Sequence, residues 1–251
     1  MASYQEIRKQ REEQQSNRAK RVSPDPTLKV IARIRTDFPS KFGIPRQSGL
    51  VDALKAAILF EPEYRNPDAF RGLEEFSHIW LLWEFSEAVR DTWSPMVKPP
   101  RLGGNQRMGV FATRSPFRPN PIGLSCVKLE GIELDSEWGP VLHVAGADLM
   151  DNTPIYDIKP YLPYTDSRPD AAGGFAEPLK DYALTVDFPE ELLFRIPLEL
   201  REAVIGVLAC DPRPSYQKDP TRIYGVEYAG YDFRFTVRDS ILTVCEVVLL
   251  S

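Results

Sequence analysis

Residues 107–134 read RMGVFATRSPFRPNPIGLSCVKLEGIEL, and this stretch decides the fold prediction. It contains a short apolar run, a loop with prolines at 116, 119 and 121, and a longer apolar run that Gly131 interrupts. Proline has no N–H to donate to a β ladder, so the loop separates two strands and presents its polar side chains at fixed angles. Short strands with Pro and Gly connections are typical of a barrel or a sandwich.

The same pattern extends over residues 29–150. We expect strands at residues 30–34, 56–60, 79–83, 108–112, 124–134 and 141–149. A single helical turn fits residues 66–73, and helices are otherwise scarce there. The predicted fold is therefore mainly β, a barrel or a sandwich.

The last 70 residues have a different pattern. Residues 189–208 fit a helix with Pro197 as a kink or restart, and RIYGVEY (222–228), YDFRFTV (231–237) and ILTVCEVVLL (241–250) read as strands. A helix followed by a meander predicts a small α+β unit. We expect a polar tail at 1–28, a β domain at 29–170, a linker at 171–181 and an α+β C-terminal domain at 182–251.

Composition excludes several classes of protein. The 251 residues are 43% hydrophobic and 27% charged, which is ordinary for a globular protein. No run approaches the roughly 20 apolar residues of a membrane span, and the N-terminus lacks the apolar core of a secretory signal. Three separated cysteines and two histidines indicate reduced thiols and no metal knot. We expect a cytoplasmic protein without membrane or metal partners.

The charge distribution is uneven. The chain has a net charge of −5, yet residues 92–129 contain six basic residues and no Asp or Glu. The rest of the chain therefore carries −11. A local basic surface on an acidic protein suits a phosphate or carboxylate ligand, although it also fits an ordinary solvated face.

Within that window, the proline-rich loop presents Arg114, Arg118 and Asn120. Donors on a stiff loop lose little entropy when they bind an anion, so we interpret the loop as functional. Residues 41–49, with Gly, Pro and basic side chains, form a weaker candidate of the same kind.

Residues 148–166 interleave four aspartates and Lys159 with three tyrosines. Carboxylates at the end of a strand can accept ribose hydroxyls, bind an ammonium group or act as a base, but Asp, Asn and Pro also form ordinary turns. Residues 211–218 add two cations and Tyr216, which could stack on a base, or they form a rigid corner between helix and strand.

Familiar nucleotide and hydrolase motifs are absent. The chain contains no G-x-G-x-x-G, G-x-x-x-x-G-K-[ST], G-x-S-x-G or H-E-x-x-H. A Rossmann site, a P-loop and a zinc hydrolase are therefore disfavoured. His78 and His143 lie within apolar runs and read as sheet residues rather than bases.

Five segments together resemble one family: FGIPRQ (42–47), RGLEEFSHIW (71–80), PPRLGG (99–104), GVFATRSPFRPNPIG (109–123) and DIKPY (157–161). They resemble the TsaA-like, TrmO-type β-barrel tRNA methyltransferases over residues 29–170, and DPRPSY (211–216) is similar to that family's C-terminal domain. The resemblance implies an S-adenosylmethionine-dependent enzyme with a small antiparallel β-barrel domain, usually a homodimer. It implies N6-methylation of the threonylcarbamoylated adenosine 3′ of the anticodon in tRNA.

The resemblance also assigns site residues. It implies cofactor contacts at Pro45, Arg46, Gln47, Phe85, Ser86, Arg114, Leu124, Gly146, Ala147, Asp148 and Leu149. We expect tRNA contacts at Arg118, Asn120, Lys159, Tyr161, Arg213 and Tyr216. Asp157, or a base reached through water, is the candidate proton acceptor.

Two positions depart from the family pattern. Asn152 stands where the family usually has Gly, which exchanges one residue that tolerates positive φ for another. Ser86 stands where some members carry His, so we assign it a contact and no chemistry.

Two other hypotheses use the same residues. A non-catalytic RNA-binding module could use the basic loop without a cofactor. A hydrolase could use Asp148, Asp151 and Asp157 with a divalent metal ion.

Overall fold

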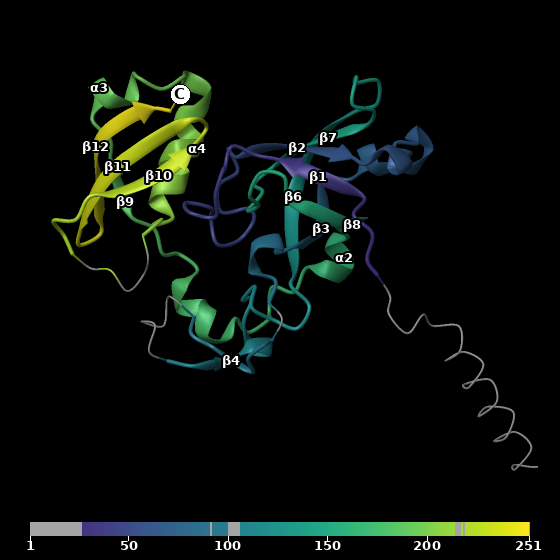
Figure 1. Ribbon diagram of the computed structural model, residues 1–251, viewed down its shortest axis with the longest axis horizontal. Coiled ribbons are helices and arrows are strands. Elements are labelled where there is room, and N and C mark those ends of the chain that lie inside the picture. Colours follow the sequence, from purple (N-terminus) through teal and green to yellow (C-terminus); the bar gives the residue numbers. More distant parts are fainter. Residues whose placement is uncertain (1–26, 91, 100–105, 214–216, 218, 251) are drawn as a thin grey trace, which may run out of the picture.

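The computed structural model describes residues 27–90, 92–99, 106–213, 217 and 219–250. Residues 1–26 of the predicted tail and Tyr216 lie outside the described residues. Two β units stand next to each other in Figure 1, one a closed barrel and the other an open sheet with helices.

The barrel has six antiparallel strands in the order β1-β2-β7-β6-β3-β8. Their bounds are β1 Ala32–Arg35, β2 Lys55–Phe60, β3 His78–Glu84, β6 Ile122–Glu133, β7 Val141–Ala145 and β8 Pro154–Pro160. Alternation decides which side chains fill it: in β3, Ile79, Leu81 and Trp83 point inward and are buried. The predicted antiparallel barrel is confirmed, and the sandwich alternative is wrong.

Short elements connect these strands. They are the 3-10 helices η1 Pro62–Tyr64, η2 Pro67–Phe70, η3 Leu73–Glu75, η4 Ser86–Ala88 and η6 Val110–Ala112, and the strands β4 Met96–Val97 and β5 Met108–Gly109. Two 3-10 helices thus cover the single turn expected at 66–73. Strand β5 ends at Gly109 instead of residue 112, because Val110–Ala112 turns into η6.

Strand β7 ends before its predicted limit at residue 149. Gly146 adopts a φ of 76°, which only glycine tolerates readily, and the chain leaves the sheet there. Strand β8 was not expected at all, because its two terminal prolines and its Asp and Lys read as a loop. It closes the barrel by pairing with both β1 and β3.

The long strand β6 creates a seam in the barrel wall. It pairs with β3 from Ile122 onward, but it pairs with β7 only from Lys128, with a register shift at Leu129 and Gly131. Two loops fill the place that β7 leaves beside the first half of β6. The Cys126 N–H donates to Ser48 Oγ at 3.1 Å, and the Gly49 N–H donates to the Gly146 carbonyl at 2.9 Å.

The C-terminal unit is a four-stranded sheet packed on a helix. The sheet order is β10-β11-β12-β9, with β9 Thr185–Asp187 parallel to β12 Ile241–Leu249, and β10 Tyr224–Tyr228 and β11 Tyr231–Arg238 antiparallel. The helical segment divides into α3 Glu190–Leu193 and α4 Leu198–Ala209, because Pro197 precedes the second helix. The predicted α+β unit is confirmed.

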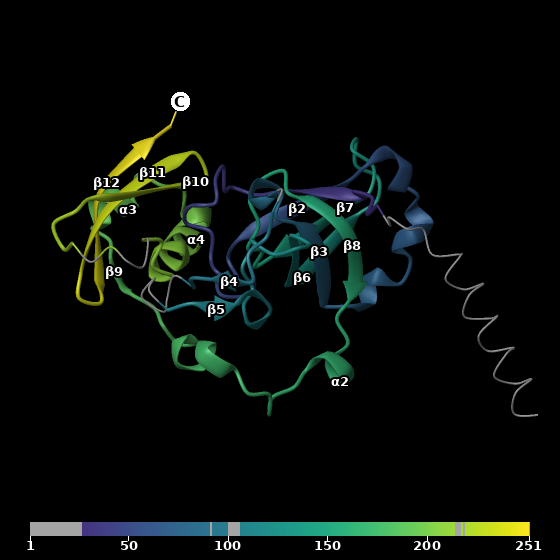
Figure 2. The same ribbon diagram turned by 60° about the horizontal axis from the view of Figure 1, so that its bottom comes forward.

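Residues 37–54, which we name the bridging segment, join the two units. Phe38, Val51 and Leu54 are buried in the same hydrophobic cluster as α4 and β10–β12. Gly43 has a φ of 84°, and a Cβ there would lie 2.1 Å from Val226 Cγ2. In Figures 1 and 2 this dark blue segment runs beside α4, on the side of the helix that faces the barrel.

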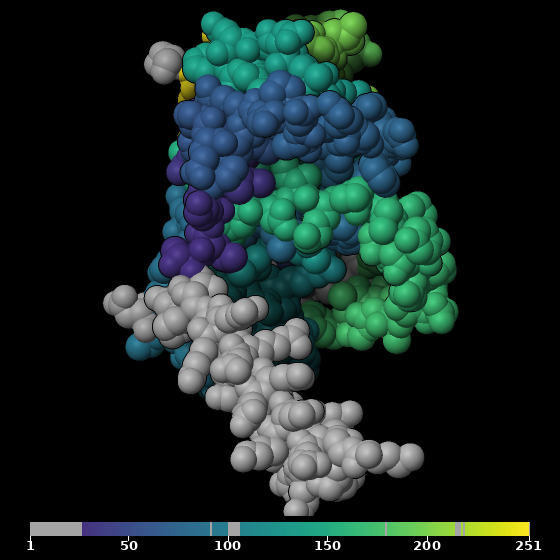
Figure 3. All heavy atoms as spheres, turned by 90° about the vertical axis from the view of Figure 1, so that its right-hand side faces the viewer, coloured from purple at the N-terminus to yellow at the C-terminus, as the bar shows by residue number. Residues whose placement is uncertain are grey.

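A second connection runs through α2 Pro163–Asp166 and the 3-10 helix η7 Gly174–Leu179. Figure 2 shows it as an extended path from β8 to β9, and in Figure 3 its green atoms form a separate ridge on the surface. The domain boundaries at 29–170, 171–181 and 182–251 stay predictions.

Candidate active site at the barrel seam

A chain of buried polar side chains ends at Asp148. Trp83 Nε1 donates to Ser125 Oγ at 2.9 Å, and Ser125 Oγ donates to Asp148 Oδ1 at 2.6 Å. The exposed fractions of Trp83 and Ser125 are 7% and 1%. Asp148 follows the Gly146 turn, so its carboxyl group stands beside the half of β6 that lacks β7.

Burial raises the pKa of Asp148 above its ordinary value. The Ser125 hydroxyl, the backbone N–H groups of Asp148 and Ser48, and the positive charge of Arg114 oppose this shift. The carboxyl group is therefore mostly desolvated, yet it faces donors and a cation from three segments. Such a group suits a ligand that brings an ammonium or a hydroxyl.

The proline-rich loop brings Arg114 to the bridging segment, where its Nη1 donates to Gln47 Oε1. Pro45 and Arg46 precede Gln47 on the same segment, which packs against the C-terminal unit at Gly43. Three stretches that are remote in sequence (45–49, 114 and 146–148) thus meet at the seam.

The other predicted cofactor residues surround this cluster. The Phe85 ring lies 4.2 Å from the Trp83 ring, and its N–H donates to the Pro121 carbonyl at 2.8 Å. Ser86 begins η4 directly after it. Leu124 is 52% exposed on β6, whereas Ala147 and Leu149 are buried. Ala147 and Leu149 therefore offer backbone groups and Leu124 offers its side chain.

Asp157 lies on the opposite side of β3 from β6. Leu82 pairs with Leu124 on β6 and with Asp157 on β8, so these three residues form one row across the sheet. Two strand spacings, about 10 Å, separate the outer pair. The Asp157 carboxylate also forms an ion pair of 3.0 Å with Lys159, and both side chains are about half exposed.

The predicted tRNA contacts are distributed over both units. Arg118 Nη1 donates to the Thr113 carbonyl at 3.1 Å, and the Asn120 carbonyl accepts from the Ile122 N–H at 2.8 Å. The Tyr161 ring lies 5.8 Å from that of Trp80 on β3. Arg213 belongs to the C-terminal unit, where it pairs with Asp211 at 2.8 Å and is only 12% exposed.

The hypothesis of a metal-dependent hydrolase is not supported by the geometry of its three aspartates. Asp148 contacts Ser125, Asp151 accepts from Arg35 and the Thr36 N–H, and Asp157 pairs with Lys159. Within the described part of the chain, no three His, Cys, Asp or Glu side chains gather as a metal site requires. Nor does any helix among the described residues have the length and apolar character needed to cross a membrane.

The structure shows the backbone position of both residues that depart from the family pattern, Asn152 and Ser86. Asn152 has a φ of 64°, so the expected turn residue with positive φ is confirmed there. Ser86 sits at the first position of η4 beside Phe85.

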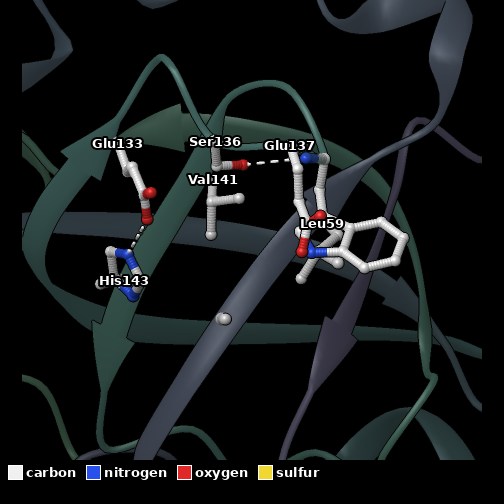
Figure 4. Close-up of a pocket in the computed structure, with 8 residues that line it drawn as sticks. Leu59, Glu133, Ser136, Glu137, Val141 and His143 are labelled. Atoms are coloured by element: carbon white, nitrogen blue, oxygen red, sulfur yellow. Dashed lines mark hydrogen bonds and ion pairs between the residues drawn. The ribbon is translucent and has the colours of Figure 1, made fainter.

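A cavity of about 400 Å³ lies elsewhere, on the outer wall of the barrel. Figure 4 shows it between Leu59, Glu137 and His143, with the His143 ring 3.2 Å from Glu133. No predicted site residue lines it. The chemistry-bearing cluster is at the seam instead, so we take the seam as the candidate active site.

Sequence reasoning missed Trp83, Ser125 and Ser48. Ser125 is the one hydroxyl residue at an inward-facing position of the apolar run 124–129. The alternation of side chains along this strand could therefore have indicated a buried polar residue there.

A closed antiparallel barrel with a polar seam places the chain among small β-barrel proteins, outside the doubly wound nucleotide-binding folds. Within that class the chain belongs to the tRNA-methyltransferase O (TrmO) family. The model of the tRNA-methyltransferase O N-terminal domain matches residues 33–167, and that of the TrmO C-terminal domain matches residues 183–249.

Individual relatives agree with this assignment. The Escherichia coli tRNA (adenine(37)-N6)-methyltransferase is 42% identical over 219 residues, which cover 84% of this chain and 92% of that protein. The human protein of the same name is 37% identical over 156 residues, covering 61% of this chain and 33% of that protein. A crystal structure of TrmO from Pseudomonas aeruginosa has a TM-score of 0.71 at 34% identity, covering 89% of this chain and 99% of that one.

Proposed function

We propose that this protein is an S-adenosylmethionine-dependent methyltransferase that N6-methylates the threonylcarbamoylated adenosine 3′ of the anticodon in tRNA. Family membership supports the reaction class, and a Pseudomonas aeruginosa relative, 40% identical over 230 residues, carries the words S-adenosylmethionine-dependent methyltransferase in its name. The single structural observation that carries the proposal is the meeting of Gln47, Arg114 and Asp148 at the seam.

The residues at the seam fit the cofactor's functional groups. Arg114 is a charged donor for the carboxylate of the methionyl part, and Asp148 is a buried acceptor for its ammonium or for a ribose hydroxyl. When bound, S-adenosylmethionine supplies the methyl group as a sulfonium. The chain's task is then mainly alignment, because an in-line displacement needs donor and acceptor held at a fixed angle.

We assign proton removal to Asp157 or to a base reached through water. The N6–H of an acylated adenine is more acidic than that of a plain amine, so a carboxylate of modest basicity suffices. The row of Leu124, Leu82 and Asp157 supports this role, since it sets Asp157 about 10 Å from a predicted cofactor contact. The acceptor base would lie between them.

Arg118 and Lys159 are the cations best suited to the threonyl carboxylate. Lys159 is exposed, and Arg118 lies on the stiff loop beside Arg114. Arg213 is the weaker choice, because its side chain is only 12% exposed in its ion pair with Asp211, whereas that of Lys159 is 63% exposed in its ion pair with Asp157. A site built around that carboxylate leaves cations unmatched when the threonyl group is missing.

We propose further that the enzyme works in the cytoplasm as a homodimer. Trp93 and Phe111 lie with their rings 6.2 Å apart and are 52% and 74% exposed, as expected for an apolar surface that a second chain covers. Light scattering measures this directly, and a molar mass of one chain would contradict it.

Methylation of matched tRNAs tests the choice of acceptor. The same tRNA is supplied with and without the threonylcarbamoyl group, and methylated nucleosides are counted by mass spectrometry. We expect the unmodified tRNA to react at least about 100-fold more slowly, which is about 2.7 kcal/mol. Arg118→Ala should slow only the modified substrate, whereas Arg71→Ala, on the remote η2–η3 turn, should slow neither. Equal rates on both tRNAs would move the acceptor to another base.

A further inference from the structure

Two buried side chains behind Asp148 have no part in the function proposed above. Trp83 donates to Ser125, and Ser125 donates to Asp148. An indole N–H can only donate, so the Ser125 oxygen has to accept from Trp83. The single hydroxyl proton of Ser125 is then directed at Asp148 Oδ1, and that oxygen has to act as an acceptor.

We propose that Trp83 and Ser125 are positioning residues that hold Asp148 as an ionised acceptor, with one oxygen committed to Ser125 and the other turned to the cofactor. The inference rests on the cofactor role proposed for Asp148. Neither residue touches the cofactor in this scheme, because both are buried in the barrel interior.

The backbone fixes the position of the Trp83 ring. Trp83 pairs with Gly123 across β3 and β6, and a Cβ at Gly123 would lie 2.2 Å from Trp83 Cε2. Any larger residue at 123 would push the indole away from Ser125. The Phe85 ring, 4.2 Å from the indole, holds it from another side.

Asp148 is also held from the bridging segment. The backbone N–H of Ser48 lies close enough to oppose the rise in the pKa of Asp148, and the Ser48 Oγ accepts from the Cys126 N–H at 3.1 Å. Ser125 on β6 therefore holds the carboxylate by a direct hydrogen bond, and Ser48 on the bridging segment lies near it. A packing role alone would not require this direction of hydrogen bonds.

Calorimetric titration with S-adenosylmethionine at several pH values tests the inference. Ser125→Ala should weaken binding about tenfold, and Trp83→Phe, which keeps a ring but loses the N–H, should weaken it about threefold. The double variant should bind as weakly as Ser125→Ala alone, since Trp83 acts through Ser125. Without the Ser125 hydrogen bond the pKa of Asp148 rises, so affinity should decline at a higher pH than in the wild type.

Controls separate this chain of contacts from a loss of packing. Trp138→Phe makes the same exchange at a half-exposed residue on the turn between β6 and β7 and should bind normally. Additive losses in the double variant, or an unshifted pH profile in Ser125→Ala, would overturn the inference. Ser125→Ala removes one oxygen and tests the scheme even if Trp83→Phe does not fold.

Asp148→Asn distinguishes the inference from the proposal on which it rests. If Asp148→Asn loses affinity but the Ser125 and Trp83 variants do not, the cofactor role of Asp148 stands and the positioning scheme is wrong. If Asp148→Asn binds like the wild type, Asp148 is no cofactor contact and both ideas fail.

Discussion

At the scale of single residues, Arg114 has one identified partner and one electrostatic target. Its guanidinium donates to Gln47, and its charge opposes the rise in the pKa of Asp148 that burial causes. It is exposed and packs into neither hydrophobic core. Its contribution is therefore expected in binding rather than in folding.

Arg114→Ala should weaken S-adenosylmethionine binding about 10- to 150-fold, because a charge-assisted contact is worth about 1.5 to 3 kcal/mol. The melting temperature should stay within about 2 °C of the wild type. Calorimetry and thermal denaturation measure the two effects. Arg71→Ala, which also removes an exposed arginine, is the matched control. Unchanged affinity would assign Arg114 to tRNA or to the surface.

The family resemblance could point to Gln47 and Arg114 as candidates because they lie in the segments that carry it, and it implies Asp148 as a third. It could not name Trp83 and Ser125, whose role depends on strand parity and on the register of β3 against β6. Nor could it detect that Arg213 pairs with Asp211, since both simply read as charges on a corner.

At the scale of elements, the bridging segment is the most constrained. Gly43 combines a φ of 84° with a Cβ position already occupied by Val226 of β10. Gly72 has a φ of 85° with nothing near its Cβ position. Comparing alanine substitutions at Gly43 and Gly72 therefore separates the cost of backbone strain from the cost of the clash with Val226.

Gly43→Ala should lower the free energy of unfolding by about 2 to 5 kcal/mol, from positive φ and overpacking together. Gly72→Ala should cost only about 1 to 2 kcal/mol, from φ alone. Urea denaturation measures both. In the Gly43→Ala background, Val226→Ala should recover part of the loss. Equal losses for the two single variants would show that the contact with β10 is unimportant.

Most strands could be predicted to within two residues because their apolar or alternating runs are bounded by charged residues or by turn residues. Strand β8 could not, since its polar residues face a solvent-exposed side of the barrel and its prolines lie at its two ends. Strand β7 was predicted too long, because Ala147 and Leu149 are buried although they have left the sheet. In most of the barrel the buried apolar residues belong to strands, but at the seam buried residues also lie outside a strand.

At the scale of the whole molecule, positive charge is concentrated in residues 92–129, and the rest of the chain is acidic. The acid-free window includes the β4–β5 hairpin, where Val97 pairs with Met108 and the exposed Lys98 and Arg107 follow and precede that pair. A field of this kind acts on phosphates even though the net charge is −5.

Affinity for tRNA should therefore fall steeply with salt. If about four phosphates are neutralised, tripling the salt concentration should cost about fiftyfold. Filter binding over a salt series gives the slope, and Lys98→Ala with Arg107→Ala should reduce it by about 2 if both contact phosphates. Arg71→Ala should leave it unchanged. A flat profile would mean that stacking and base contacts carry recognition.

The bridging segment and the C-terminal sheet share one hydrophobic core, and this affects the order in which parts of the chain can fold during synthesis on the ribosome. Phe38, Val51 and Leu54 are synthesised before the strands β10–β12 that cover them, because those strands follow the whole barrel in the sequence. N-terminal elements generally fold first, so the barrel can form while these three side chains still lack their cover. We expect the loop carrying Pro45, Arg46 and Gln47 to become fixed only after β10–β12 have emerged. A chain that stops before β10 should thus hold this loop in no single position, and we expect such a chain to be enzymatically silent.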